Sequence, residues 1–165
     1  MKILVACIGN IFLGDDGFGV EVASRLLARE LPGGIFVKDF GIRGFDLAYA
    51  LLDAYDLAIL VDACPRGGTP GTLYVIEPEQ GDGTGASIDP HAMNPVSVLR
   101  MAQSMGGVSS PVLIVGCEPG DLGPEEGKMG LSEPVAAAIE EAANLVLFLV
   151  DRALRGELIA SGAEA

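Results

Sequence analysis

Apolar and polar positions are grouped along the chain in blocks that predict strands followed by helices. Lys2–Ile8 is an apolar run ended by a Gly-Asn pair, which is typical of a buried strand. From Gly17 to Leu31 apolar side chains recur at helical spacing, and Pro32 ends that helix. The same patterns predict strands at Ile35–Phe40, Leu57–Val61, Thr72–Ile76 and Val112–Val115, and helices at Gly44–Asp53, Pro95–Met105 and Glu133–Arg155.

This order of elements predicts an α/β protein, a three-layer αβα sandwich around a mostly parallel five-stranded sheet. Only a turn separates Leu57–Val61 from Thr72–Ile76, so these two strands cannot be joined by a parallel crossover. The strand at Thr72–Ile76 is therefore expected to lie antiparallel at an edge. We expect residues 1–156 to form one domain and residues 157–165 to be a flexible C-terminal tail.

Composition excludes several classes of protein. Half of the 165 residues are apolar and 20% are charged, which excludes a disordered chain. A formal net charge of −13 argues against nucleic acid and anionic membranes as partners. No apolar run is long enough for a membrane span or a signal peptide, so we expect a cytoplasmic protein. The three cysteines have no C-x-x-C spacing, and we expect small buried side chains.

Polar side chains follow the predicted strands at the edge where α/β sheets bind ligands, beyond the carboxyl ends of the strands. Asp15 and Asp16 follow the first strand, and Asp62 closes the third. His91, the only histidine, ends the long polar loop after the fourth strand. Each has an ordinary explanation alone: an aspartate can cap a helix or start a turn, and a histidine can be an exposed loop residue.

Taken together, Asp16, Asp62 and His91 predict a metal-binding triad of two carboxylates and one imidazole. Carboxylates supply negative charge to a divalent cation, and imidazole suits zinc, nickel, copper or iron. Three protein ligands leave positions open for water or substrate. Serine triads, cysteine–histidine pairs and nucleotide sites each lack a local signature in this chain.

Three motifs occur in register with these residues: G-N-I-F-L-G-D-D-G-F-G-V, L-V-D-A after the third strand, and D-P-H-A-M-N-P-V before a helix. With them the chain resembles the hydrogenase maturation endopeptidase family over nearly its whole length. The resemblance implies a protease that removes a C-terminal peptide from the large-subunit precursor of a nickel–iron hydrogenase. Asp16, Asp62 and His91 would be its catalytic and metal-binding residues. Asp39 is either an auxiliary carboxylate or a turn residue.

The resemblance also implies that the protein holds no metal permanently, because nickel is supplied by the substrate. Zinc or cadmium are other divalent ions that can occupy the site. Gly9, Asn10 and Gly17 would shape the loop that presents Asp16, and we expect a monomer. Two routes stay open: nickel polarises the scissile carbonyl or a bound water, or an aspartate acts as the general base.

Two other functions fit the same residues. A self-contained hydrolase would hold zinc tightly in this triad and act on small substrates. A non-proteolytic chaperone or metal-delivery protein would dock on the hydrogenase precursor and leave its mass unchanged.

Overall fold

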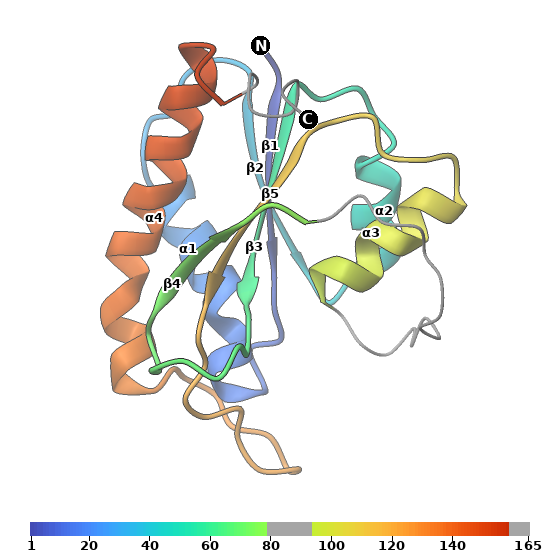
Figure 1. Cartoon of the computed structure of the whole chain (residues 1–165). Coiled ribbons are helices and arrows are strands. Elements are labelled where there is room, and N and C mark those ends of the chain that lie inside the picture. The colour runs from blue at the N-terminus through green and yellow to red at the C-terminus, as the bar shows by residue number, and fades with distance from the viewer. Residues whose placement is uncertain (79–93, 159–165) are drawn as a thin grey trace.

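The computed structural model describes residues 1–78 and 94–158, and it arranges them as one sheet with helices on both faces (Figure 1). The strands are β1 (Ile3–Ile8), β2 (Ile35–Gly41), β3 (Leu57–Ala63), β4 (Leu73–Ile76) and β5 (Val112–Cys117). The helices are η1 (Gly14–Gly17, a 3-10 helix), α1 (Phe18–Leu27), α2 (Gly44–Ala50), α3 (Pro95–Ser104) and α4 (Glu133–Leu154). Of the predicted tail, residues 159–165 lie outside the described residues.

The sheet has the strand order β2-β1-β3-β5-β4. Four strands pair in parallel, and β4 runs antiparallel to β5 at the edge, which confirms the expected antiparallel edge strand. β1 and β3 lie in the interior of the sheet and are buried along their whole length. Their continuous apolar sequences follow from this position, because helices cover both of their faces.

β3 and β5 extend two residues beyond their predicted ends. Asp62 pairs with Gly116, and Ala63 pairs with Cys117. Backbone pairing therefore continues through small and polar residues that an apolar pattern does not mark as strand. As a result Asp62 lies within the sheet, not in a turn that follows it.

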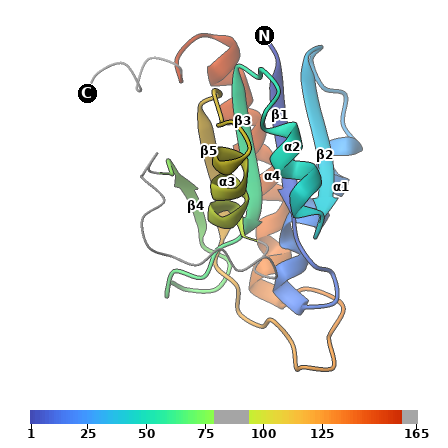
Figure 2. The ribbon, with the colours of Figure 1, turned by 90° about the vertical axis from the view of Figure 1, so that its right-hand side faces the viewer.

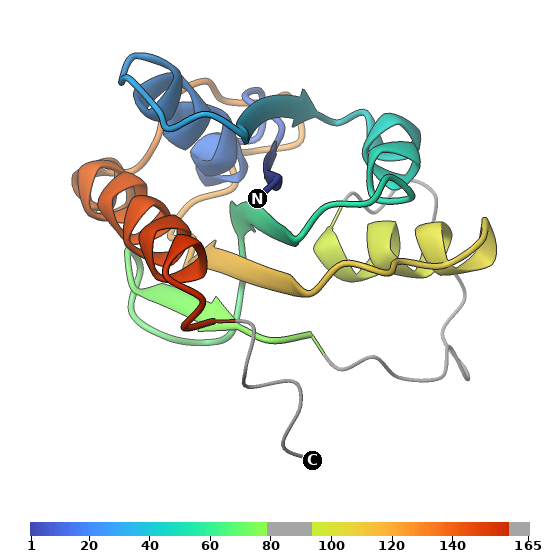
Figure 3. The same cartoon turned by 90° about the horizontal axis from the view of Figure 1, so that it is seen from above.

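Helices α1 and α4 cover one face of the sheet, and α2 and α3 cover the other (Figures 1 and 3). Val5 and Ile139 belong to the core on the first face, while Leu4, Leu60 and Val98 belong to the core on the second. Alternate residues of each central strand thus serve two cores, which confirms the predicted αβα sandwich. In the part of the chain that the structure describes, every helix is too short or too polar to cross a bilayer.

The carboxyl ends of the parallel strands meet at one edge, the lower one in Figure 1. η1 and the loop before it follow β1 at this edge, and the segment 118–132 extends beyond it (Figures 1 and 2). The loops after β1 and β2 are joined there, because Gly9 donates its N–H to the carbonyl oxygen of Gly41 at 3.0 Å. The predicted site residues of the described chain therefore share one end of the molecule.

Candidate active site

The carboxylates of Asp16 and Asp62 are electrostatic neighbours at this edge. η1, which carries Asp16, packs against β3. The side chain of Asp62 is 1% exposed. Asp62 follows Ala58 and Leu60 at every second position of β3, so its side chain points to the α2–α3 face as theirs do. Burial, and then the negative charge of Asp16, raise the pKa of Asp62 well above its usual value. The fold thus brings together two predicted site residues, Asp16 after β1 and Asp62 in β3.

Neither carboxylate has an ion-pair partner among the residues that the structure describes. One oxygen of Asp62 accepts the N–H of Ala63 at 2.8 Å, and Oδ2 of Asp16 accepts the N–H of Asn10 at 3.0 Å. Burial raises the pKa of Asp16, and the Asn10 donor opposes this rise only in part. Two adjacent acids without a counterion form a site that a divalent cation would stabilise.

The loop that presents Asp16 is built from the residues predicted to shape it. A Cβ on Gly9 would lie 2.3 Å from the backbone oxygen of Asp16, so only glycine lets the end of β1 approach η1 this closely. Asn10 donates to Asp16 through its backbone and accepts the N–H of Phe12 through its side chain, at 2.9 Å. Gly17 packs against Ile11 on the other side of Asp16. These contacts hold the Asp16 carboxylate at the edge.

Asp15 serves a different purpose from its neighbour. Its side chain is fully buried and accepts four hydrogen bonds of 2.7 Å, from the N–H groups of Gly120, Asp121 and Ser132 and from the Ser132 hydroxyl. Burial alone would raise the pKa of Asp15, but these donors outweigh it and lower the pKa. Neither aspartate of the pair caps α1. Asp15 instead anchors the loop before α4 to the loop that carries Asp16.

Glu118 is a third buried carboxylate, and sequence reasoning assigned it no role. Its side chain accepts the N–H of Arg66 at 3.0 Å, the N–H of Gly68 and the hydroxyl of Tyr74 at 3.2 Å. Burial alone would raise the pKa of Glu118, but these donors lower it below its usual value. Glu118 thereby fixes the loop that follows Asp62. An acid directly after the apolar β5 was the one sequence signal for it.

Of the two remaining candidate residues, Asp39 and His91, the structure describes only Asp39. Asp39 is exposed in β2 near its end, and its side chain accepts the N–H of Gly41 at 2.8 Å, as a turn residue does. His91 lies outside the described residues. Among the residues that are described, no three histidines, cysteines, aspartates or glutamates are gathered as a metal-binding group. The third ligand of the predicted triad therefore stays a prediction.

The cysteines are poor candidates for a nucleophile. Cys7 and Cys117 are buried, and Cys64 is half-buried. Burial raises the pKa of Cys7 strongly, and it raises the pKa values of Cys64 and Cys117 to about 12. Because the thiolate is the reactive form, these protonated thiols act as small apolar side chains.

Several known proteins with related sequence or the same fold are named hydrogenase maturation proteases or endopeptidases. Residues 20–148 match the model of a family described as hydrogenase maturation protease. The chain is 30% identical over 149 residues to the hydrogenase 2 maturation protease of Escherichia coli K12, covering 89% of each protein.

Two solved structures have the same architecture. One is the hydrogenase maturating endopeptidase HybD from Escherichia coli, with a TM-score of 0.76, 29% identity and coverage of 93% of this chain and 94% of that one. The other is the [NiFe] hydrogenase maturation protease HycI from Thermococcus kodakarensis KOD1, with a TM-score of 0.67, 27% identity and coverage of 88% and 89%.

Proposed function

Because the chain belongs to the hydrogenase maturation protease family, we propose that it removes a C-terminal peptide from the nickel-loaded large-subunit precursor of a nickel–iron hydrogenase. Nickel in the precursor is the recognition element, and Asp16, Asp62 and His91 engage it. The observation that carries this proposal is the pair of neighbouring acids, one of them fully buried, neither of which pairs with a basic side chain of the described residues.

The two acids suit a metal that arrives with the substrate. Asp16 is half-buried in η1 and can reach a cation held by another protein, while Asp62 lies in the neighbouring strand β3. A divalent cation at this position offsets the repulsion between the two carboxylates, so binding of the nickel-loaded precursor is favoured over binding of the empty one.

Cleavage then adds water across the peptide bond. The water oxygen bonds to the scissile carbonyl carbon, the carbon–nitrogen bond breaks, and the leaving amine gains a proton. An aspartate of the pair acts as the general base, which accepts the proton of the attacking water and returns it to the amine. Nickel in the substrate supplies Lewis acidity to the carbonyl or to the water.

Mass spectrometry of the nickel-loaded precursor before and after incubation tests the proposal. We expect the precursor to lose the mass of a C-terminal peptide, whereas a chaperone would leave its mass unchanged. Asp62→Ala and His91→Ala proteins should leave the precursor intact. Processing by both variants at the wild-type rate would remove these residues from the mechanism.

Elemental analysis of the purified protein separates this proposal from a hydrolase with a resident metal. We expect far less than one zinc or nickel ion per chain, because the metal belongs to the substrate. One tightly held zinc per chain would favour the self-contained hydrolase instead.

A further inference from the structure

A row of side chains crosses the sheet from the acid pair to the antiparallel edge. Strand pairing places Asp62 opposite Gly116, and Gly116 opposite Tyr74. Cross-strand partners point to the same face of a sheet, so the Tyr74 side chain emerges on the α2–α3 face with that of Asp62. Gly116 between them contributes no side chain of its own to the row.

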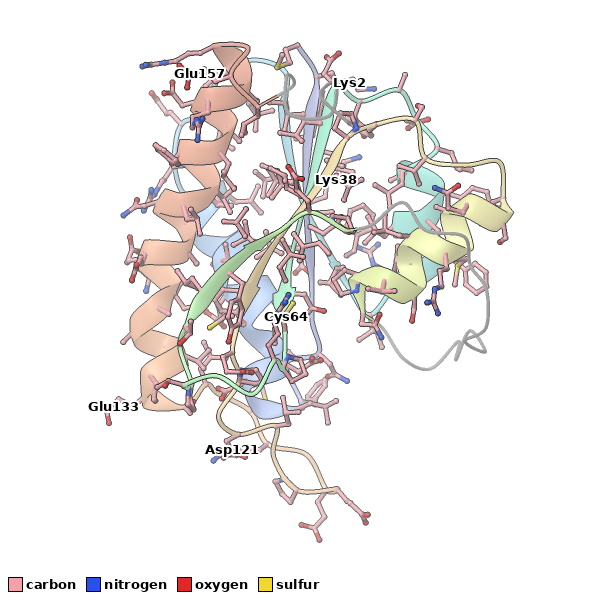
Figure 4. All side chains as sticks on the ribbon, in the orientation of Figure 1. Lys2, Lys38, Cys64, Asp121, Glu133 and Glu157 are labelled. Carbon is pink, nitrogen blue, oxygen red and sulfur yellow. The ribbon has the colours of Figure 1, made fainter. Side chains whose placement is uncertain are left out.

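Cys64 fills the place that a side chain at position 116 would take. A Cβ on Gly116 would lie 2.7 Å from the sulfur of Cys64, so the thiol itself lies over Gly116. Figure 4 labels Cys64 at the lower end of β3. Its thiol is half-buried and protonated. It therefore places an uncharged group between the acids at one end of the row and Tyr74 at the other.

Arg66 stands at the Tyr74 end of this row. The guanidinium carbon is 5.5 Å from the centroid of the Tyr74 ring. Glu118 holds both residues in place, because it accepts the N–H of Arg66 at 3.0 Å and the hydroxyl of Tyr74 at 3.2 Å. The Tyr74 ring therefore positions the guanidinium of Arg66, and the buried Glu118 carboxylate positions its backbone.

The charge of Arg66 has no ion-pair partner among the described residues, although the chain is strongly acidic. The side chain is exposed, in the loop directly after the strand of Asp62. Glu118 is already occupied by backbone donors and by Tyr74. An oriented and exposed guanidinium of this kind is well placed to take a carboxylate in two parallel hydrogen bonds.

We propose that Arg66 is a specificity-determining residue that binds a carboxylate of the peptide released from the precursor. This inference rests on the proposed function. Two strand spacings separate β3 from β4, about 10 Å, which an extended chain covers in about three residues. A scissile carbonyl at Asp62 would thus bring the side chain or the terminal carboxylate of a residue about three positions beyond the bond to Arg66.

Cleavage kinetics with the nickel-loaded precursor test this role. Arg66→Met should lower kcat/KM about ten- to hundredfold, mainly through KM, because a charge-assisted pair is lost, and Arg66→Lys should restore part of the loss. Arg155→Met is the matched control, since Arg155 is an exposed residue at the C-terminal end of α4, which lies at the opposite end of the molecule from the site (Figure 1). We expect the control to cleave at the wild-type rate. All three variants should unfold at the wild-type temperature.

Changes in the precursor distinguish the two sources of the carboxylate. Replacing an acid about three residues beyond the bond by its amide removes a side-chain carboxylate. Adding a Gly-Ser segment to the C-terminus moves the terminal carboxylate out of reach. One of these changes should lower kcat/KM as Arg66→Met does, and it should have no further effect on the Arg66→Met protein.

Arg66→Met kinetics equal to wild type would overturn this inference alone. The same holds if both precursor changes leave the kinetics of the wild-type protein unaltered, or if Arg66→Met lowers the unfolding temperature in proportion to its loss of activity. Failure of the wild-type protein to cleave any precursor would overturn the proposed function, and this inference with it.

Discussion

Asp15 accepts both the backbone N–H and the hydroxyl of Ser132, each at 2.7 Å, although 117 positions separate the two residues. Ser132 is the N-cap residue of α4, but its side chain makes no capping hydrogen bond, and its hydroxyl donates to Asp15. The adjacent aspartates therefore divide two tasks. Asp15 is buried and ties distant segments together, while Asp16 keeps its carboxylate at the edge of the sheet.

Asp15→Asn should lower the free energy of unfolding by about 3 kcal/mol, because the new amide N–H₂ group would face buried N–H donors that need an acceptor. Urea unfolding followed by circular dichroism measures the change. Asp53→Asn, at an exposed aspartate after α2, is the matched control and should alter stability little. Equal unfolding midpoints for the two variants would show that Asp15 is not an anchor.

Asp62→Asn should increase stability at neutral pH while it abolishes cleavage. Burial and Asp16 raise the pKa of Asp62 above its ordinary value of 3.8, so the folded wild-type protein binds this proton more tightly than the unfolded chain does. Wild-type stability therefore falls as the pH rises from 3.8 through the raised pKa. Asparagine carries no such penalty, so we expect Asp62→Asn to be more stable than wild type at neutral pH.

Denaturant unfolding at a series of pH values checks this prediction. The stability difference between Asp62→Asn and wild type should be small near about pH 3, where the carboxyl is protonated in both states, and should grow toward neutral pH. An Asp62→Asn protein that is less stable than wild type at neutral pH would contradict the account.

The fold and part of the site could be predicted because local pattern and topology agree. Apolar runs marked the central strands, and the short connection before β4 required an antiparallel edge. The edge rule for α/β sheets then brought Asp16 and Asp62 together, although they are far apart in the chain. Local apolar pattern could not place the last residues of β5, because Gly116 and Cys117 continue the strand through pairing with β3.

The roles of Asp15 and Glu118 could not be predicted, because their partners are distant in sequence. The donors to Asp15 come from residues more than 100 positions away, and Glu118 binds a loop about 50 positions before it. The spacing of residues within a short segment cannot predict contacts over such distances in the sequence. Sequence adjacency likewise gives no physical reason to choose Asp16 over Asp15 as the presented acid; burial and hydrogen bonding make that choice.

Glu118→Gln should reduce stability at neutral pH and lose this effect in acid. Donors from the loop after β3 hold the pKa of Glu118 below its ordinary value of 4.5. A lowered pKa contributes stability that is present above 4.5 and is lost as the pH falls through the folded-state pKa. Thermal unfolding at neutral and acidic pH measures the difference, with the exposed Glu125→Gln as the control. A constant difference across this pH range would exclude the charge as its cause.

Phe12→Ser should raise KM for the precursor without lowering stability. Phe12 is 58% exposed beside the loop of Asp16, so its ring is available to a docked protein. Loss of the buried ring in the complex should weaken binding by about 2 kcal/mol, which is more than tenfold in KM. Phe148→Ser is the control, because Phe148 is 55% exposed on the outer face of α4. Equal KM values for both variants would place the docking surface elsewhere.

The central claim is that Asp16 and Asp62 recognise nickel carried by the substrate. Its most direct test compares cleavage of nickel-loaded and nickel-free precursor by the wild-type and Asp62→Asn proteins, with the precursor mass as the readout. The account predicts that the wild-type protein cuts only the nickel-loaded precursor and that Asp62→Asn cuts neither. Equal cleavage of both precursors by the wild-type protein, or normal cleavage by Asp62→Asn, would contradict it.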